Sequence, residues 1–528
     1  EMLRSLVGSE MCIRDRENIM HKKKWLSVLI GTIIGTMSLP ASVFAADSAT
    51  ALPKTEGKPR LLVTQDGEVD DMNTLIHTLL YSNDIDLEGI VQTSSKLHYS
   101  GDDTTESLRW MGTDWMYEFL DAYAEVYDNL KIHDEDYPSP DDLRAITKVG
   151  NIKNVSDTSE ETEGSELVKE RILAEDDRPL YIEVGGGANT VARALMSIEE
   201  EYKDQDGWEE LYNRICEKVI LFAWGMQDDC YLNYIQPNWP SMRMVDVSGS
   251  TLAYGYRWAT LEELSDESRE KLSSAWMKEN IEQNLGALMD KYVTWGDGTY
   301  LEGEADTDQY GTNEALLGDD TLWVGHAYEQ YDFLSEGDSP AWFVTIPNGL
   351  RSLEDLSYGG WDGRYALKEN DENPDVRLYQ AAKGNEKGIA QWIAAIQSDF
   401  AMRAKWCVTD KYEDANHLPE VSVEEGIDLT AKAGDEITLN GTAVDPDGDT
   451  TTFRWYHYPY GDTYEEAEDE DGNPVAIEVT ASGENQETAT FTIPEDAKSG
   501  DTIHIIMEGV DGGGTNPVAY QRVIVTVE

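Results

Sequence analysis

Basic residues are scarce in this chain. Its 528 residues include 41 Lys and Arg against 104 Asp and Glu, for a formal net charge of -63. Such a charge repels nucleic acid phosphates and anionic membrane surfaces, so we expect no nucleic acid partner. The chain is nevertheless expected to fold. It contains 15 Trp and 27 Tyr, too many for a disordered acidic segment, and it is long enough for two or more domains.

Cysteine is scarce as well, with four residues in the whole chain. Apart from Cys12 near the N-terminus, Cys216, Cys230 and Cys407 stand at irregular spacing. This spacing predicts neither a disulfide framework nor a zinc site. A bridge between Cys216 and Cys230 is one alternative, but isolated buried thiols are the more frequent arrangement.

A long hydrophobic run occurs only near the N-terminus, within residues 20–45. Lys22–Lys24 precede the apolar stretch Trp25–Leu39, and small residues follow as far as Ala45. This order is typical of a secretory signal peptide, with a retained membrane anchor as the alternative. No later segment is long and apolar enough to span a bilayer, so we expect a secreted protein, extracellular or periplasmic, without a membrane partner. Residues 1–19 precede the signal and are interpreted as an artefact of the gene model.

Two regions with different hydrophobic patterns follow. Residues 57–410 alternate strand-like runs with helical ones, the strands expected at 58–64, 85–92, 179–184 and 218–224 and the helices at 72–82, 108–130 and 190–201. This alternation predicts an α/β fold with a mainly parallel sheet flanked by helices, and ligands outside the carboxyl ends of the strands. Residues 420–528 show short alternating runs between turns rich in Gly, Asp and Pro, which predicts an immunoglobulin-like β-sandwich.

An acidic loop stands where the first strand gives way to a helix. Within eight residues it contains Asp66, Glu68, Asp70 and Asp71. Four carboxylates on one tight loop repel one another unless a cation neutralises them, and ligands that are all oxygen suit a hard ion such as Ca2+. Acidic capping of the helix explains one or two of these residues but not all four, because each contributes only about 0.3 to 1 kcal/mol.

This loop resembles the aspartate-rich N-terminal loop of the inosine-uridine preferring nucleoside hydrolases, whose pattern is Asp-x-Asp-x-x-x-Asp-Asp. Asp66, Asp70 and Asp71 match the last three aspartates, and Thr64 replaces the first. The resemblance implies that Asp66 is a calcium ligand and the general base that takes a proton from the attacking water. It also implies that Asp71 is a calcium ligand and that Asp70 binds a sugar hydroxyl.

Two further segments strengthen the resemblance. The run GGGANT at 185–190 is similar to the Gly-Pro-Leu-Thr-Asn loop of the family, in which a backbone carbonyl ligates calcium, and Asn189 occupies the ligand position. The segment EGDSP at 336–340 is similar to its His-Asp-Pro segment, which makes Asp338 the last calcium ligand. The similarity is closer still to a divergent branch, the nucleoside-hydrolase-like domain of secreted bacterial proteins described as cellulose-binding, and it extends over about residues 57–528.

The chain also departs from the family pattern. Gly337 stands where the family often has a His that protonates the leaving group, and Ser95 lies near the position of a ribose-binding Asn. His77, His98 and His326 lie near matched segments, but a lone His is more often structural than catalytic. Trp361 is a candidate for stacking on a sugar or a base and equally a candidate core residue.

The resemblance implies two functions. The first is a calcium-dependent hydrolase of an N-ribosyl or related glycosyl bond, acting on a small nucleoside or sugar substrate. The alternative is a carbohydrate-binding protein without catalysis whose partner is cellulose or another polysaccharide. We favour the hydrolase, because a set of carboxylates suited to a metal is costly to keep without a ligand to serve.

Overall fold

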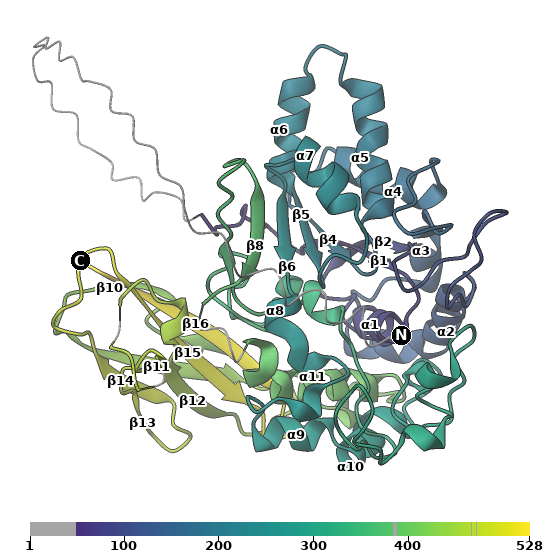
Figure 1. The fold of residues 1–528 in the computed structure, drawn as a ribbon. Coiled ribbons are helices and arrows are strands. Elements are labelled where there is room, and N and C mark those ends of the chain that lie inside the picture. Colours follow the sequence, from purple (N-terminus) through teal and green to yellow (C-terminus); the bar gives the residue numbers. More distant parts are fainter. Residues whose placement is uncertain (1–48, 384–387, 466, 471) are drawn as a thin grey trace, which may run out of the picture. The chain divides into compact units, whose positions relative to one another are not determined.

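The computed structural model describes residues 49–383, 388–465, 467–470 and 472–528 (Figure 1). The predicted signal peptide at 20–45 and the preceding segment 1–19 lie outside these residues. Within them, no helix combines the length and the apolar character needed to cross a membrane.

An eight-stranded sheet forms the centre of the first region. Its strand order is β3-β2-β1-β4-β5-β6-β8-β7, and neighbouring strands are parallel except for β7 and β8. The strands are β1 (Arg60–Gln65), β2 (Asp86–Gln92), β3 (Thr147–Val149), β4 (Leu180–Val184), β5 (Val219–Ala223), β6 (Arg243–Asp246), β7 (Tyr365–Leu367) and β8 (Arg377–Ala381). Because β1 pairs with β2 on one side and β4 on the other, the loops that follow these three strands lie side by side.

Helices cover both faces of this sheet. They are α1 (Val69–Leu80), α2 (Trp115–His133), α3 (Pro140–Ala145), α4 (Glu163–Leu173), α5 (Asn189–Tyr202), α6 (Trp208–Lys218), α7 (Gln236–Asn238), α8 (Ser248–Thr251), α9 (Asp266–Leu272), α10 (Ser274–Met277) and α11 (Ile393–Trp406). Successive strand residues point to opposite faces. Leu61 and Val63 of β1 therefore share a hydrophobic cluster with α1, α2 and α11, whereas Leu62 shares one with α4, α5 and α6.

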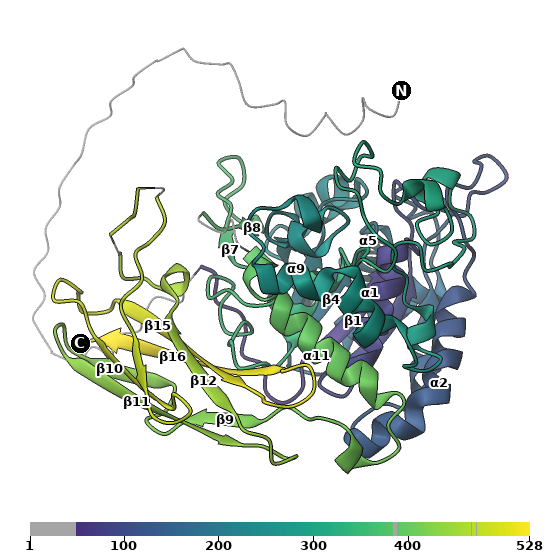
Figure 2. The ribbon, with the colours of Figure 1, turned by 90° about the horizontal axis from the view of Figure 1, so that it is seen from below.

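Two four-stranded sheets make up the C-terminal region (Figure 2). Their orders are β10-β16-β15-β12 and β13-β14-β11-β9, and all pairs are antiparallel except β10 with β16. The strands are β9 (Glu420–Val423), β10 (Asp428–Ala431), β11 (Glu436–Val444), β12 (Thr452–His457), β13 (Thr480–Ser482), β14 (Thr488–Thr492), β15 (Thr502–Val510) and β16 (Val518–Val527). Residues from both sheets, among them Leu439, Phe491 and Ile505, share one core. The predicted fold class, a mainly parallel α/β sheet followed by a β-sandwich, is confirmed.

One expected helix begins later than predicted. The pattern at 108–130 is helical in the structure only from Trp115. Arg109 and Gly112 have positive φ angles of 45° and 95°, which a right-handed helix does not accommodate. The prediction of isolated thiols is confirmed, since Cys216, Cys230 and Cys407 are free and buried.

Arg522 of β16 joins the sandwich to the first region. Its buried guanidinium donates hydrogen bonds to the carbonyls of Leu350 (2.7 Å) and Gly359 (2.6 Å) and lies 3.0 Å from Nδ1 of His504. Burial lowers the pKa of Arg522. Burying a charge costs free energy unless the charge is hydrogen-bonded. The hydrogen bonds of Arg522 therefore define a specific contact between the two regions.

Candidate metal centre

Acidic side chains gather beyond the carboxyl ends of β1 and β4. Strand β1 ends at Gln65, the chain turns at Gly67 with a φ of +90°, and α1 begins at Val69. Glycine adopts this φ without strain, so the turn brings Asp66 back beside the first turn of α1. The backbone N–H of Asp66 donates to Oδ1 of Asp71 over 3.2 Å.

The ligand atoms fall into two groups. Carboxylate oxygens of Asp70, Asp71 and Asp338 lie within 4.8 Å of one another. A second group with the same spacing consists of oxygens of Asp66 and Glu68 and a ring nitrogen of His98. The structure thus brings together the four aspartates predicted for the site.

Glycines let these carboxylates approach the backbone closely. A Cβ at position 186 would stand 2.7 Å from Cβ of Asp66, and one at position 185 would stand 3.0 Å from Oδ1 of Asp71. At position 337, a Cβ would lie 2.7 Å from Oδ2 of Asp70. A cradle of glycines therefore surrounds the acids, and the space beside residue 337 is taken by Asp70.

Glu183 is a further acid at this site, and the sequence did not single it out. It lies on β4, is 0% exposed, and neither carboxylate oxygen has a hydrogen-bond partner among the described residues. Its Oε1 would stand 2.6 Å from a Cβ at position 185, on the same side as Asp71. An acid in the middle of the apolar strand sequence LYIEV, just before three glycines, was the sign that could have identified it.

The acids raise one another's pKa values. Burial is the main cause for Asp70, Asp71, Asp338 and Glu183, and repulsion from neighbouring carboxylates adds to it. In the described part of the chain, no ion pair with Lys or Arg relieves these four groups. Oδ2 of Asp66 is also buried without a hydrogen bond. Oxygen ligands, close spacing and uncompensated charge fit a divalent cation such as Ca2+.

His98 contacts the acids of this site, whereas a lone histidine is more often structural. Its ring is 1% exposed, and Nε2 lies 2.6 Å from Oε1 of Glu304. Nδ1 faces Oδ1 of Asp66 at 3.8 Å and Oε2 of Glu68 at 3.9 Å. Burial lowers the pKa of His98, but the nearby carboxylates Asp66, Glu304 and Glu68 outweigh it and raise the value to about 9.

Glu68 connects the acids to an aromatic pair. Burial and the charge of Asp70 raise the pKa of Glu68 to about 8. Its Oε1 accepts a hydrogen bond of 2.9 Å from the hydroxyl of Tyr256. The Tyr256 ring lies 5.6 Å from that of Trp323, which is 52% exposed. The side chains of Tyr256 and Trp323 therefore connect the acids to the protein surface.

The other two histidines do not join the acids. Nδ1 of His77 lies 2.7 Å from Oε2 of Glu336, and its ring stacks on Phe400 at 4.2 Å within the core. His326 is exposed. Both arrangements agree with structural or surface roles.

Two protein-family models match this chain. The family model described as "Cellulose-binding Sde182, nucleoside hydrolase-like domain" matches residues 60–365, which is more than half of the chain. The model described as "Cellulose-binding protein Sde0182, C-terminal domain" matches residues 436–527. The chain belongs to the Sde182 family of cellulose-binding proteins. No protein with a curated description matches its sequence.

One solved structure shows the same fold as this Sde182-family chain, and others match it more distantly. One is a nucleoside hydrolase-related hypothetical protein from Saccharophagus degradans that is associated with carbohydrate metabolism. It is 24% identical, with a TM-score of 0.64, and the match covers 89% of this chain and all of the other. A more distant match is an inosine-guanosine nucleoside hydrolase, 11% identical with a TM-score of 0.34, covering 65% of this chain and 98% of that one.

Two residues predicted for the site, Asn189 and Ser95, form side-chain hydrogen bonds with other parts of this Sde182-family chain. The side-chain amide of Asn189 donates to Ser94 Oγ and to the carbonyls of Asn151 and Asp157. The side chain of Asn189 therefore stabilises neighbouring loops. A role for Asn189 in calcium binding stays a prediction. Ser95 Oγ accepts the backbone N–H groups of Leu97 (2.9 Å) and His98 (3.1 Å), so Ser95 shapes the turn that carries His98.

Trp361 lies in the core. It is 2% exposed, and its ring meets Phe343 and Tyr520 edge to face at 6.3 and 6.4 Å. This placement agrees with the core alternative and gives no support to stacking on a substrate.

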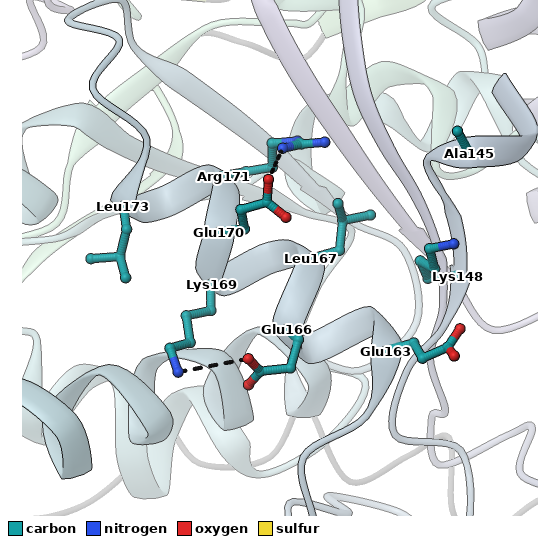
Figure 3. A pocket seen from close by; sticks show the side chains of 9 residues that line it. All are labelled: Ala145, Lys148, Glu163, Glu166, Leu167, Lys169, Glu170, Arg171 and Leu173. Atoms are coloured by element: carbon teal, nitrogen blue, oxygen red, sulfur yellow. Dashed lines mark hydrogen bonds and ion pairs between the residues drawn. The ribbon is translucent and has the colours of Figure 1, made fainter. Parts of the chain in front are cut away.

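The structure also has a surface hollow beside α4, and its lining residues differ from those of the metal centre. It has a volume of about 520 Å³ and is lined largely by charged side chains, including the pairs Lys169–Glu166 and Arg171–Glu170 (Figure 3). None of the acids of the metal centre lines it. Open hollows with mutually paired charges are common on protein surfaces, so the buried acids remain the better candidate.

Proposed function

We propose that this protein is a calcium-dependent hydrolase that cleaves an N-ribosyl or related glycosyl bond. The observation that supports this most directly is the buried set of aspartates around the glycine cradle, which forms no ion pair with Lys or Arg among the described residues. Clusters of carboxyl groups with strongly raised pKa values are typical of active sites. The fold of the family, which is nucleoside hydrolase-like, agrees with this chemistry.

Each aspartate has a role in the proposed reaction. Asp71 and Asp338 would hold the ion, and Asp66 would be a further ligand. When bound, Ca2+ supplies a positive charge that lowers the pKa of a water and fixes sugar hydroxyls beside it. Asp66 takes the proton of the attacking water, and Asp70 accepts a hydrogen bond from a sugar hydroxyl.

The surrounding charge favours the same bond cleavage. The transition state of glycosyl hydrolysis carries positive charge on the sugar ring. A bound cation favours the ionised forms of Asp70, Glu68 and Glu183, and these carboxylates then stabilise that charge more than they stabilise the neutral ground state. The same field repels phosphorylated compounds, so we expect an uncharged nucleoside or sugar substrate.

The proposal is tested by sugar release from a panel of nucleosides and glycosides. Protein beginning at Ala46 is assayed with Ca2+ and with a chelator, and Asp66→Asn is compared with Asp229→Asn, an exposed aspartate on a nearby loop. We expect calcium-dependent release that Asp66→Asn lowers by about 100-fold or more and that Asp229→Asn leaves unchanged. Equal activity of the two variants would remove Asp66 as the base.

A second candidate function is binding of cellulose or another polysaccharide without catalysis. Two observations favour it, namely the description of the family as cellulose-binding and the glycine at position 337 in place of a proton donor. Co-sedimentation with insoluble cellulose tests it, with chelator present so that calcium-dependent binding is separated from other binding. The signal peptide prediction places either function outside the cytoplasm, and N-terminal sequencing of exported protein checks that placement.

A further inference from the structure

The second group of ligand atoms differs from the first in its chemistry. Asp70, Asp71 and Asp338 offer only oxygen, whereas the group of Asp66 and Glu68 includes a ring nitrogen of His98. That nitrogen, Nδ1, is buried and has no hydrogen-bond partner among the described residues. A buried imidazole nitrogen without a partner costs free energy unless a ligand completes it.

Outer contacts hold all three ligand atoms in place. Glu304 accepts a hydrogen bond of 2.6 Å from Nε2 of His98. The Tyr256 hydroxyl donates to Oε1 of Glu68, so the other oxygen of Glu68, Oε2, faces the histidine. The backbone N–H of Glu68 donates to Oδ1 of Asp66 over 3.1 Å. In metal sites a ligating histidine typically bonds through its other nitrogen to a carboxylate, as His98 does here.

We propose that Asp66, Glu68 and His98 form a second metal site, which takes a first-row transition ion such as Zn2+. Mixed nitrogen and oxygen ligands suit such ions, while the three aspartates suit Ca2+. Ligands about 2.1 Å from a tetrahedral ion stand about 3.4 Å apart. The distances from Nδ1 of His98, 3.8 and 3.9 Å, are close to that spacing.

Asp66 links the two sites. Its Oδ1 belongs with Glu68 and His98, while Oδ2 is buried and unpartnered. The second site does not depend on the proposed hydrolysis, because ion binding is measurable without turnover.

A protonated imidazole is the competing occupant of the space between these groups. With a proton on Nδ1, His98 pairs electrostatically with Asp66 and Glu68, and the pKa of about 9 agrees with that pairing in the absence of an ion. A transition ion at the site replaces this proton. The number of transition ions bound per chain distinguishes a protonated His98 from an occupied metal site.

The experiment is a titration of the full chain with Co2+, which reports coordination through its visible absorption. Protein stripped with a chelator is first saturated with Ca2+, then titrated with Co2+ and back-titrated with Zn2+. We expect one further equivalent of Co2+, displaced by Zn2+. His98→Gln should weaken it by more than about 100-fold and Glu304→Gln by about 10- to 100-fold. His326→Gln, which changes an exposed histidine, serves as the matched control.

Asp338→Asn separates the two sites. This variant should lose the calcium step and keep the Co2+ step. The proposal is overturned if calcium-saturated protein takes up no Co2+, if His98→Gln binds Co2+ as the unaltered chain does, or if Asp338→Asn loses both steps together. Glu68→Gln repeats the test on a second ligand, and circular dichroism confirms that each variant is folded.

Discussion

Gly337 and Asp70 are in direct contact, since a Cβ at position 337 would lie 2.7 Å from Oδ2 of Asp70. Position 337 is the one at which the resemblance to the nucleoside hydrolases predicts a His. In this chain the carboxylate of Asp70 occupies the space that such a side chain needs. The lack of that proton donor is therefore coupled to the placement of Asp70, which we propose to bind a sugar hydroxyl.

A methyl group at position 337 is predicted to displace Asp70 without unfolding the protein. Gly337→Ala pushes only the flexible end of a side chain, so the free energy of unfolding should change by less than about 1 kcal/mol. The KM for the sugar substrate should rise several-fold, because the hydroxyl contact of Asp70 is lost. Gly255→Ala is the control, as a Cβ there meets nothing closer than 3.6 Å. Unchanged KM in Gly337→Ala would contradict the role of Asp70.

Asp338→Asn is predicted to stabilise the protein in chelator and to remove its response to Ca2+. Without an ion, loss of one carboxylate relieves the repulsion that raises the neighbouring pKa values. With Ca2+ at about 100 times its Kd, the unaltered chain gains about 2.7 kcal/mol, which the variant lacks. Thermal unfolding with Ca2+ and with chelator measures both effects. A variant that kept the full calcium response would exclude Asp338 as a ligand.

Protein without metal is predicted to lose stability as the pH rises. The pKa of Glu68 is raised from 4.5 to about 8, so the folded state binds a proton that the unfolded state has released. The resulting stability is complete below pH 4.5 and disappears as the pH approaches 8. His98, raised from 6.5 to about 9, acts in the same direction between those values.

Urea denaturation in chelator at several pH values from 4.5 to 9 tests this dependence. Glu68→Gln should flatten it, whereas Glu302→Gln, at an exposed position two residues from Glu304, should keep it. The control matters because the net charge of -63 also destabilises the folded state as acids ionise. Identical profiles for the two variants would show that Glu68 does not contribute to the effect.

Trp323 is predicted to bind the substrate through its exposed ring. Stacking of a ring on an aromatic side chain contributes about 0.5 to 1.5 kcal/mol, so Trp323→Ala should raise KM by up to about 10-fold with little change in kcat. Tyr300→Ala is the matched control, since Tyr300 lies in the same irregular segment and is 69% exposed. Equal effects of the two changes would show that Trp323 is not part of the substrate site.

The sequence predicted the parts of the site that are local or carried by a family motif. The Asp66–Asp71 loop lies within one strand-to-helix turn, and Asp338 lies in a motif, so both were identified. The partnership of His98 with Glu304 joins residues 206 positions apart, and Glu304 lies in a segment without regular periodicity. Glu183 was missed because an acid in a buried strand acquires meaning only when its neighbours are known. The strand and helix pattern, by contrast, is repeated along the chain and predicted the neighbouring strands β1, β2, β4 and β5, but it missed β3, β6, β7 and β8.

The contact made by Arg522 has a consequence for how this chain can be divided. Separating the two regions at 410–420 would leave a guanidinium on β16 without the carbonyls of Leu350 and Gly359 that now receive its hydrogen bonds. The isolated sandwich would then expose a cationic, aromatic-lined surface that the whole chain does not have, since the ring of Tyr458 lies 4.9 Å from the same guanidinium. Affinity for polysaccharide measured on the sandwich alone would therefore describe an artificial surface, and the undivided chain is the right object for such measurements.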